Sequence, residues 1–390
     1  MNHTTSETHL SVPERGLVFD VGSLMAYLQQ LDDPRDPRGV RYSLVNLLTL
    51  LILAKLGGED TMKGMAEWIK LRGADLVRLL HLPRTSLPHQ TTYERVLDVL
   101  DVRVFEQMIG TFFAQHTTEK NCVSFDGKTL RGTIPPGETQ GTHLLAAYTP
   151  QQGVVLLQME VADKTSEITA LPRLLERLDL DGCVVTGDAL LTQREIFEKI
   201  VKANADYVLP VKANQTNLRH AVASVFLPPP PHPGHTPTLL PHRQAKTVTA
   251  RHGRIEVRYL TVSSHLNAYL DWPHLGQVFR LQRIVHHQKT GQLTYQVQFG
   301  ITSLTAEACS PKRLLALIRD HWHIENRLHY VRDVTFHEDA CRIRHPHRQH
   351  LLACLNNLVI GLIRRCAFPY VPDARRFFAV HYAQALQLLL

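Results

Sequence analysis

Cysteine is scarce in this chain, and its spacing indicates neither a disulfide scaffold nor a metal motif. Six of the 390 residues are cysteines, they are scattered, and none forms a CxxC pair. This spacing argues against a disulfide-stapled fold and a zinc ribbon, and it favours free thiols in a reducing compartment. Histidine is frequent, at 23 residues, but the sequence has no His-rich run and no HExxH motif.

Long apolar runs are also missing. The most apolar stretch, Leu44–Leu56, contains three polar residues and is shorter than the ~20 residues that cross a bilayer. The first residues lack a charged region followed by an apolar run, so we expect no signal peptide. These absences predict a soluble cytoplasmic protein rather than a membrane protein.

Charge is nearly balanced. Lys and Arg total 43 against 36 Asp and Glu, which gives a formal net charge of +7. A hydrophobic content of 44% with 20% charged residues is ordinary for a folded protein and argues against wholesale disorder. The small basic excess is compatible with a polyanionic partner, but many basic proteins bind no nucleic acid, so it decides nothing alone.

The chain has three regimes. We expect a flexible leader over residues 1–21 and an all-helical domain over 22–118, where apolar residues recur at three- and four-residue spacing. This domain is either a structural helical bundle or a DNA-reading module, and the pattern leaves both open. Its candidate phosphate contacts are Lys63, Lys70, Arg72, Arg78 and Arg84.

From residue 119 the pattern changes to alternating strands and helices, which predicts an α/β fold with a mixed sheet. Proline density over 228–242 predicts a linker or an exposed loop. Beyond it, alternating apolar and polar residues over about 243–305 predict an antiparallel β insertion. Helices follow to residue 390.

Two aspartates end strand-like runs of this region. Asp126 ends CVSFD and Asp188 ends CVVTGD, and carboxylates at strand ends lie at the edge where α/β sheets bind ligands. Taken singly, each fits ordinary turn chemistry. Glu325 lies on a predicted helix whose 3.6-residue spacing places His321, Trp322, Leu328, His329 and Arg332 on the same face.

Together, Asp126, Asp188 and Glu325 form a candidate catalytic and metal-binding triad. Carboxylates without a nearby cysteine suit a hard cation, so we expect Mg²⁺ or Mn²⁺. Two such ions ~3.5–4 Å apart are used in phosphodiester cleavage. Basic and imidazole side chains flank the acids, as a phosphate backbone would require. These candidate DNA contacts are Lys128, Arg131, Arg194, Lys212, His321, Arg327, His329 and Arg332.

Five motifs carry a family resemblance over nearly the whole chain: FDGKTLRG, TGDALLTQREIFEKIVKANADYVLPVKANQ, HGRIEVRYLTVSS, YQVQFGITSL and HWHIENRLHYVRDVTFHEDACRIR. In this order they resemble the insertion-sequence DDE transposases of the ISAs type, the group that includes the H-repeat-associated proteins. The resemblance implies a ribonuclease-H-like catalytic domain over 119–390, interrupted by the β insertion, after a transposase-associated helical domain. It implies the same triad.

The implied function is a DNA transposase that hydrolyses phosphodiesters at transposon ends and joins the freed ends to target DNA. Its partner is double-stranded DNA, at terminal inverted repeats and target, and we expect a homodimer because two ends must meet. One alternative is a DDE-derived protein that binds DNA without cutting it. Another is a zinc-dependent hydrolase that uses His321, Glu325 and His329, which follow one another at four-residue spacing.

Overall fold

The computed structural model describes residues 22–116, 122–161, 166–227, 242–251, 253–341, 343, 345–366 and 368–390. The predicted leader and most of the proline-rich linker lie outside these residues. The chain divides into two compact units. One comprises Met1–His116 together with Val331–Leu390, and the other comprises Thr117–Tyr330. Each unit is described by itself.

The first unit is helical. Its α-helices are α1 (Leu24–Gln29), α2 (Leu44–Leu56), α3 (Met62–Leu71), α4 (Gly73–Leu79), α5 (Gln90–Val99), α6 (Val102–Gln115), α11 (Tyr330–Val334, of which all but Tyr330 belong to this unit), α12 (Pro346–Arg364), α13 (Val371–Val380) and α14 (Tyr382–Gln387). Two short 3₁₀ turns accompany them, η1 (Pro37–Gly39) and η6 (Glu338–Ala340). No helix in the described ranges is both long and apolar enough to cross a membrane.

The core of this unit is built on α2 and α12. Both helices are buried on nearly all sides, as expected of helices that are apolar around their circumference. Side-chain oxygens of Ser43 and Thr61 cap α2 and α3 by accepting backbone N–H bonds. Because α12 packs on α2, α5 and α6, the last sixty residues belong to the helical unit, which differs from the predicted division at residue 119.

The second unit is built on a nine-stranded sheet in the order β3-β2-β1-β4-β5-β9-β8-β7-β6. Its strands are β1 (Cys122–Thr129), β2 (His143–Thr149), β3 (Val154–Val161), β4 (Val184–Gly187), β5 (Asp206–Val211), β6 (Arg243–Arg251), β7 (Arg254–Ser263), β8 (Gln277–His287) and β9 (Leu293–Thr302). β1, β4 and β5 run parallel, and all other neighbours are antiparallel. The fold is therefore mixed α/β.

The region predicted as a β insertion coincides with β6–β9. These strands do not form a separate sheet, because β9 pairs with β5 and extends the first five strands. Residues 288–292 connect β8 to β9, where the sequence predicts a turn, with Gly291 at a φ of +68°.

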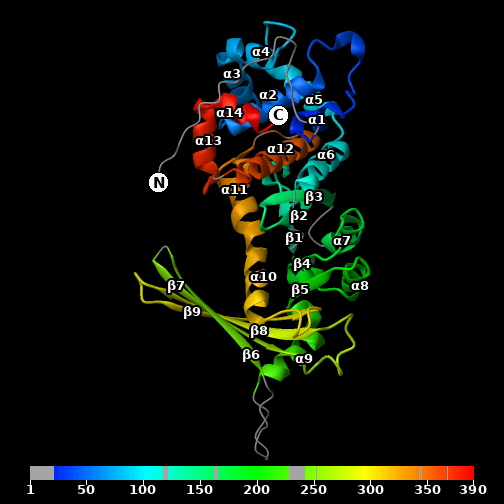
Figure 1. The fold of residues 1–390 in the computed structure, drawn as a ribbon, viewed down its shortest axis with the longest axis vertical. Helices are drawn as coiled ribbons and strands as arrows, with labels where there is room; N and C mark the ends of the chain where they lie inside the picture. Colours follow the sequence, from blue (N-terminus) through cyan, green and yellow to red (C-terminus); the bar gives the residue numbers. More distant parts are fainter. Residues whose placement is uncertain are drawn as a thin grey trace, which may run out of the picture. The chain divides into compact units, whose positions relative to one another are not determined.

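Helices cover the two faces of the sheet (Figure 1). α7 (Glu167–Leu175), α8 (Arg194–Lys202) and α9 (Thr216–Phe226) pack on one face, and α10 (Pro311–His323) packs on the other. Side chains of β1 alternate between these layers: Val123 and Phe125 lie in the α7 layer, and Cys122 lies in the α10 layer. Asp126 therefore points to the α10 face.

Candidate active site

Asp126 and Asp188 lie at one edge of the sheet. β1 and β4 pair in parallel as far as Phe125 opposite Gly187, and the two aspartates are the next residues. The short 3₁₀ turn η3 (Ala189–Leu191) begins directly after Asp188. Both carboxylates are partly exposed, with side-chain exposures of 20% and 35%. The structure thus places both aspartates at adjacent, partly exposed positions.

The helix of Glu325 changes its winding at that residue. α10 is α-helical, and the following segment η5 (Ile324–His329) is a π-helical turn, which is wider by one hydrogen-bonded residue. In this turn Glu325 and His329 face Asp126, and one ligand atom from each of the three lies within 4.8 Å of the others. Such turns are rare in proteins, and those that occur often lie at functional sites.

His329 contacts Asp126 through one ring nitrogen, and its other ring nitrogen has no hydrogen-bond partner among the described residues. Its Nδ1 lies 3.3 Å from Asp126 Oδ2. In the tautomer that carries its proton on Nδ1, Nε2 presents a lone pair. Nε2 is buried and has no hydrogen-bond partner among the described residues. Because a buried unsatisfied nitrogen is costly, a cation or a donor group at this position would stabilise the site.

Asp188 has a different partner. Its Oδ1 accepts a hydrogen bond from Lys212 Nζ at 3.1 Å, and it also accepts from the backbone N–H of Ala189. Lys212 follows β5, so three consecutive parallel strands contribute to this edge. The carboxylate of Asp188 does not belong to the group of three formed by Asp126, Glu325 and His329.

His321 lies beside both aspartates. Burial lowers its pKa below the ordinary value, while the charges of Asp126 and Asp188 act in the opposite direction. Its Nδ1 lies 3.2 Å from the hydroxyl of Thr186, which in turn contacts Ser124 Oγ at 2.8 Å. The imidazole of α10 is therefore held against Thr186 of β4, and burial favours its neutral form, which can exchange hydrogen bonds with a phosphate or a hydroxyl.

The other predicted DNA contacts differ in exposure. Arg131, Arg194, Lys212 and Arg327 are exposed on the second unit, and Lys128 is buried in β1. Arg194 contacts Glu198 and Asp271 at 3.3 and 3.2 Å, and surface pairs of this kind hold a side chain only weakly.

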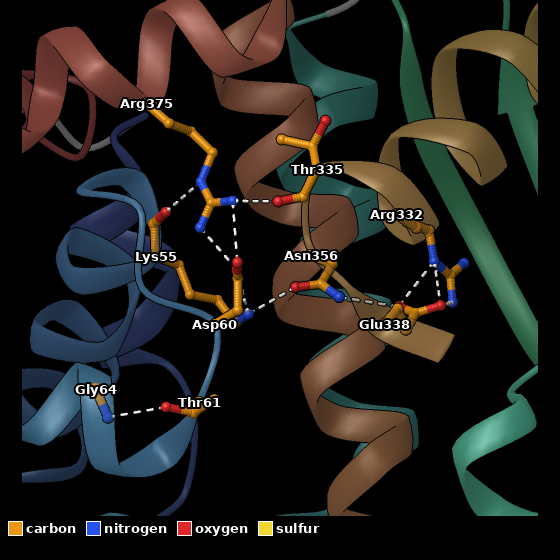
Figure 2. A network of polar contacts seen from close by, with 9 residues as sticks. All are labelled: Lys55, Asp60, Thr61, Gly64, Arg332, Thr335, Glu338, Asn356 and Arg375. Atoms are coloured by element: carbon orange, nitrogen blue, oxygen red, sulfur yellow. Dashed lines mark hydrogen bonds and ion pairs between the residues drawn. The ribbon is translucent and has the colours of Figure 1, made fainter. Parts of the chain in front are cut away.

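Arg332 does not fit the predicted phosphate contact. Its side chain is fully buried in the helical unit, where the guanidinium pairs with Glu338 at 2.8 Å (Figure 2). Asn356 donates to the same carboxylate and accepts from Lys55 Nζ at 2.6 Å. Arg375 binds the neighbouring Asp60 through both terminal nitrogens. Arg332 is thus part of a buried polar network and is not positioned to contact a DNA phosphate.

The predicted zinc site is not favoured. His321 belongs to no three-residue ligand group within the described part of the chain, because its Nδ1 faces Thr186 and Glu325 groups with Asp126 instead. Thr186 is a site residue that the sequence analysis missed. It precedes Asp188 by two residues in a strand, and strand alternation would have placed both on the same face.

Comparisons with known proteins identify the family of the chain. The family model described as "Transposase DDE domain" matches residues 117–362, and the one described as "DDE_Tnp_1-associated" matches residues 25–113. The chain is 30% identical to the putative transposase YncI of Escherichia coli O157:H7 over 365 residues, with 89% of each chain covered. It is 27% identical to the H repeat-associated putative transposase YhhI of Escherichia coli K12, covering 88% of this chain and 91% of the relative.

Both family models match in the chain order expected from the motifs, and together they span most of the protein. The transposase model covers the strands and helices that carry Asp126, Asp188 and Glu325. The chain therefore belongs to the family of DDE transposases, and its function is that of a DNA transposase, a polynucleotidyl transferase and endonuclease.

Proposed function

We propose that Asp126, Asp188 and Glu325 are the catalytic triad and that they hold two divalent cations, Mg²⁺ or Mn²⁺. The observation that supports this most directly is the convergence of Asp126, Glu325 and His329 within 4.8 Å. Asp188, directly after the neighbouring strand β4, supplies the third carboxylate. For this, the ion pair between Asp188 and Lys212 must either break or move together with the carboxylate.

The donor set suits such cations. Carboxylate oxygens are the ligands that Mg²⁺ and Mn²⁺ prefer, and no cysteine belongs to this group. His329 Nδ1, 3.3 Å from Asp126 Oδ2, adds a nitrogen donor to the same group. When bound, two divalent ions would supply Lewis-acid activation of the attacking oxygen and stabilisation of the leaving oxygen.

The chain's own residues position the DNA. His321 and His329 offer imidazole nitrogens at the sheet edge, and Lys212 offers a cation next to Asp188. Exposed Arg131, Arg194 and Arg327 can neutralise backbone phosphates around this edge, with Lys128 contributing charge from within β1. These contacts orient the scissile phosphodiester; they do not choose its sequence.

Two reactions would use this site. Water first cleaves a phosphodiester at the transposon end, which frees a 3′-hydroxyl. That hydroxyl then attacks a phosphodiester of target DNA, so one P–O bond forms as another breaks and no covalent protein intermediate is needed. We propose inverted-repeat ends as the substrate and a homodimer in the synaptic complex, because two ends react together.

We also propose that β1–β5 with their helices form a ribonuclease-H-like domain. An antiparallel β3-β2-β1 arm followed by parallel β4 and β5, joined through helices, supports this assignment. For the compartment we propose the bacterial cytoplasm, in association with the nucleoid.

The triad is tested by Asp126→Asn, Asp188→Asn and Glu325→Gln, assayed on linear DNA carrying the inverted repeats that flank the gene. We expect each change to reduce Mg²⁺- or Mn²⁺-dependent cleavage and joining by roughly 100-fold or more, while mobility-shift binding of the same DNA persists. Asp320→Asn is the matched control, because Asp320 lies on α10 outside the ligand group. Wild-type cleavage in any triad variant removes that residue from the proposal.

A further inference from the structure

Gly127, the residue after Asp126, lies in unusually close contact with two polar side chains. A Cβ at this position would lie 2.2 Å from Glu167 Oε1 and 2.5 Å from His143 Nε2. Both distances are far below van der Waals contact, so a larger residue requires these groups to move. The space that a side chain would occupy is filled by a carboxylate and an imidazole.

These two side chains belong to a hydrogen-bonded row along β1. His143 Nε2 lies 2.7 Å from Glu167 Oε1, and its Nδ1 lies 2.8 Å from Thr129 Oγ1. With Glu167 ionised, Nε2–H donates to the carboxylate and the Thr129 hydroxyl donates to Nδ1, which satisfies both ring nitrogens. Glu167 and His143 are 2% and 4% exposed, so water does not compete for these bonds.

The row lies on the opposite side of the sheet from the site. Strand alternation directs Asp126 to the α10 face, and Gly127 and Thr129 to the face covered by α7. Glu167 is the first residue of α7, and His143 pairs with Thr129 across β1 and β2. The surrounding layer is apolar, where a polar pair costs free energy unless it is well bonded.

We infer that Glu167, through His143 and the backbone of Gly127, is a positioning residue for Asp126. The buried polar row packs closely against the β1 backbone at Gly127, immediately after the carboxylate, and thereby sets the direction in which that carboxylate meets Glu325 and His329. This inference rests on the proposed role of Asp126 as a metal ligand.

Glu167→Gln tests it, because the amide keeps the size and removes the charge of the acceptor. Mn²⁺ affinity of the full chain without DNA is measured by the electron paramagnetic resonance signal of free Mn²⁺. We expect a roughly 10- to 100-fold rise in the dissociation constant, the range seen when a group supporting a metal ligand is lost. Cleavage of inverted-repeat DNA should recover towards the wild-type rate at saturating Mn²⁺, which loss of folding would not allow.

The chain offers a matched control. Asp60 and Arg375 form a largely buried ion pair at 2.6 Å in the helical unit, outside the candidate metal-binding groups. Asp60→Asn should lower the melting temperature while the Mn²⁺ dissociation constant stays at the wild-type value. Thr129→Val, a milder change in the same row, should shift Mn²⁺ affinity in the direction of Glu167→Gln by a smaller factor, and it replaces that variant if Glu167→Gln does not fold.

The outcomes separate this inference from the proposed function. If Asp126→Asn loses Mn²⁺ binding while folded Glu167→Gln and Thr129→Val bind Mn²⁺ as the wild type does, the positioning role is wrong and the triad stands. If Asp126→Asn binds Mn²⁺ and cleaves DNA as the wild type does, the proposed function fails, and the positioning role fails with it.

Discussion

Histidines 143 and 329 flank Asp126 from opposite sides of the sheet, and they differ in how their ring nitrogens are used. His143 has a partner at each nitrogen, Thr129 and Glu167, which is the pattern of a residue that holds structure. His329 contacts Asp126 through Nδ1, and its Nε2 has no partner within the described ranges. At the scale of single residues, the hydrogen-bond partners of each ring nitrogen therefore distinguish a histidine with a structural role from one that can bind a ligand.

Lys55 provides a prediction at the same scale. It is buried on α2, its Nζ donates to Asn356 Oδ1, and burial lowers its pKa to about 8 although Asp60 lies 4.0 Å away (Figure 2). Between pH 8 and 10.5 the unfolded chain keeps the proton that the folded chain has lost. Unfolding then takes up a proton, so the contribution of Lys55 to the free energy of unfolding rises with pH, by about 3 kcal/mol over this window.

The measurement is urea unfolding of the wild type and of Lys55→Met at pH 7.5, 9 and 10.5. The wild type should gain stability relative to Lys55→Met as the pH rises, since methionine has no proton to lose. A difference between the two proteins that is constant over this range would show that Lys55 keeps an ordinary pKa in the fold.

At the scale of elements, the helix of Glu325 shows how far sequence reasoning reaches. Uniform 3.6-residue spacing predicts one face for Glu325, His321, Trp322, His329 and Arg332. In the structure Trp322 is 54% exposed and Arg332 is fully buried, so the two do not share a face, and the π-helical turn lies between them. The location of the acids at strand and helix ends follows from local pattern, but the wider turn depends on tertiary contacts that periodicity does not encode.

Arg332 and Arg327 form a matched pair for testing this assignment. Arg332→Gln breaks a buried ion pair, so we expect the free energy of unfolding to fall by about 3–5 kcal/mol. Arg327→Gln changes an exposed residue, so stability should move by less than about 0.5 kcal/mol. DNA binding should respond in the opposite order: Arg327→Gln reduces the magnitude of the salt slope by about 1, and folded Arg332→Gln leaves it unchanged.

Chemical denaturation and mobility shifts over a range of salt concentrations measure both effects. If folded Arg332→Gln shows a smaller slope of log DNA affinity against log salt concentration than the wild type, Arg332 contacts a phosphate after all.

At the scale of the whole molecule, the order of regimes could be predicted from the sequence, and the grouping of its ends could not. The helical spacing of apolar residues over the first hundred residues and the alternation of strand and helix patterns from residue 119 are local signals. The assignment of α12 to the helical unit rests on packing against α2 and α6, more than two hundred residues earlier in the chain. The same holds for Glu167 and His143, whose types and positions carry no motif and which meet only through sheet register and helix packing.

Salt dependence tests the polyanion interaction of the whole chain. A protein that releases counterions from several phosphates loses affinity steeply, and contacts to 6–10 phosphates correspond to roughly 10³–10⁵-fold between 50 and 200 mM salt. We expect inverted-repeat DNA to show a steep linear decrease of log affinity with log salt concentration, measured by fluorescence anisotropy. An affinity independent of salt over this range contradicts phosphate recognition by the basic residues at the sheet edge.

The pairing of β9 with β5 has a consequence for how this protein could change in evolution or by design. Through β9 the inserted segment completes the hydrogen bonding of β5, along Val208–Val211 opposite Phe299–Thr302. Removing β6–β9 would leave β5 with a bare polypeptide edge able to recruit strands from other molecules, a common origin of aggregation. The insertion is thus not a detachable module. A shortened version must keep at least one strand, or another cover, at that edge.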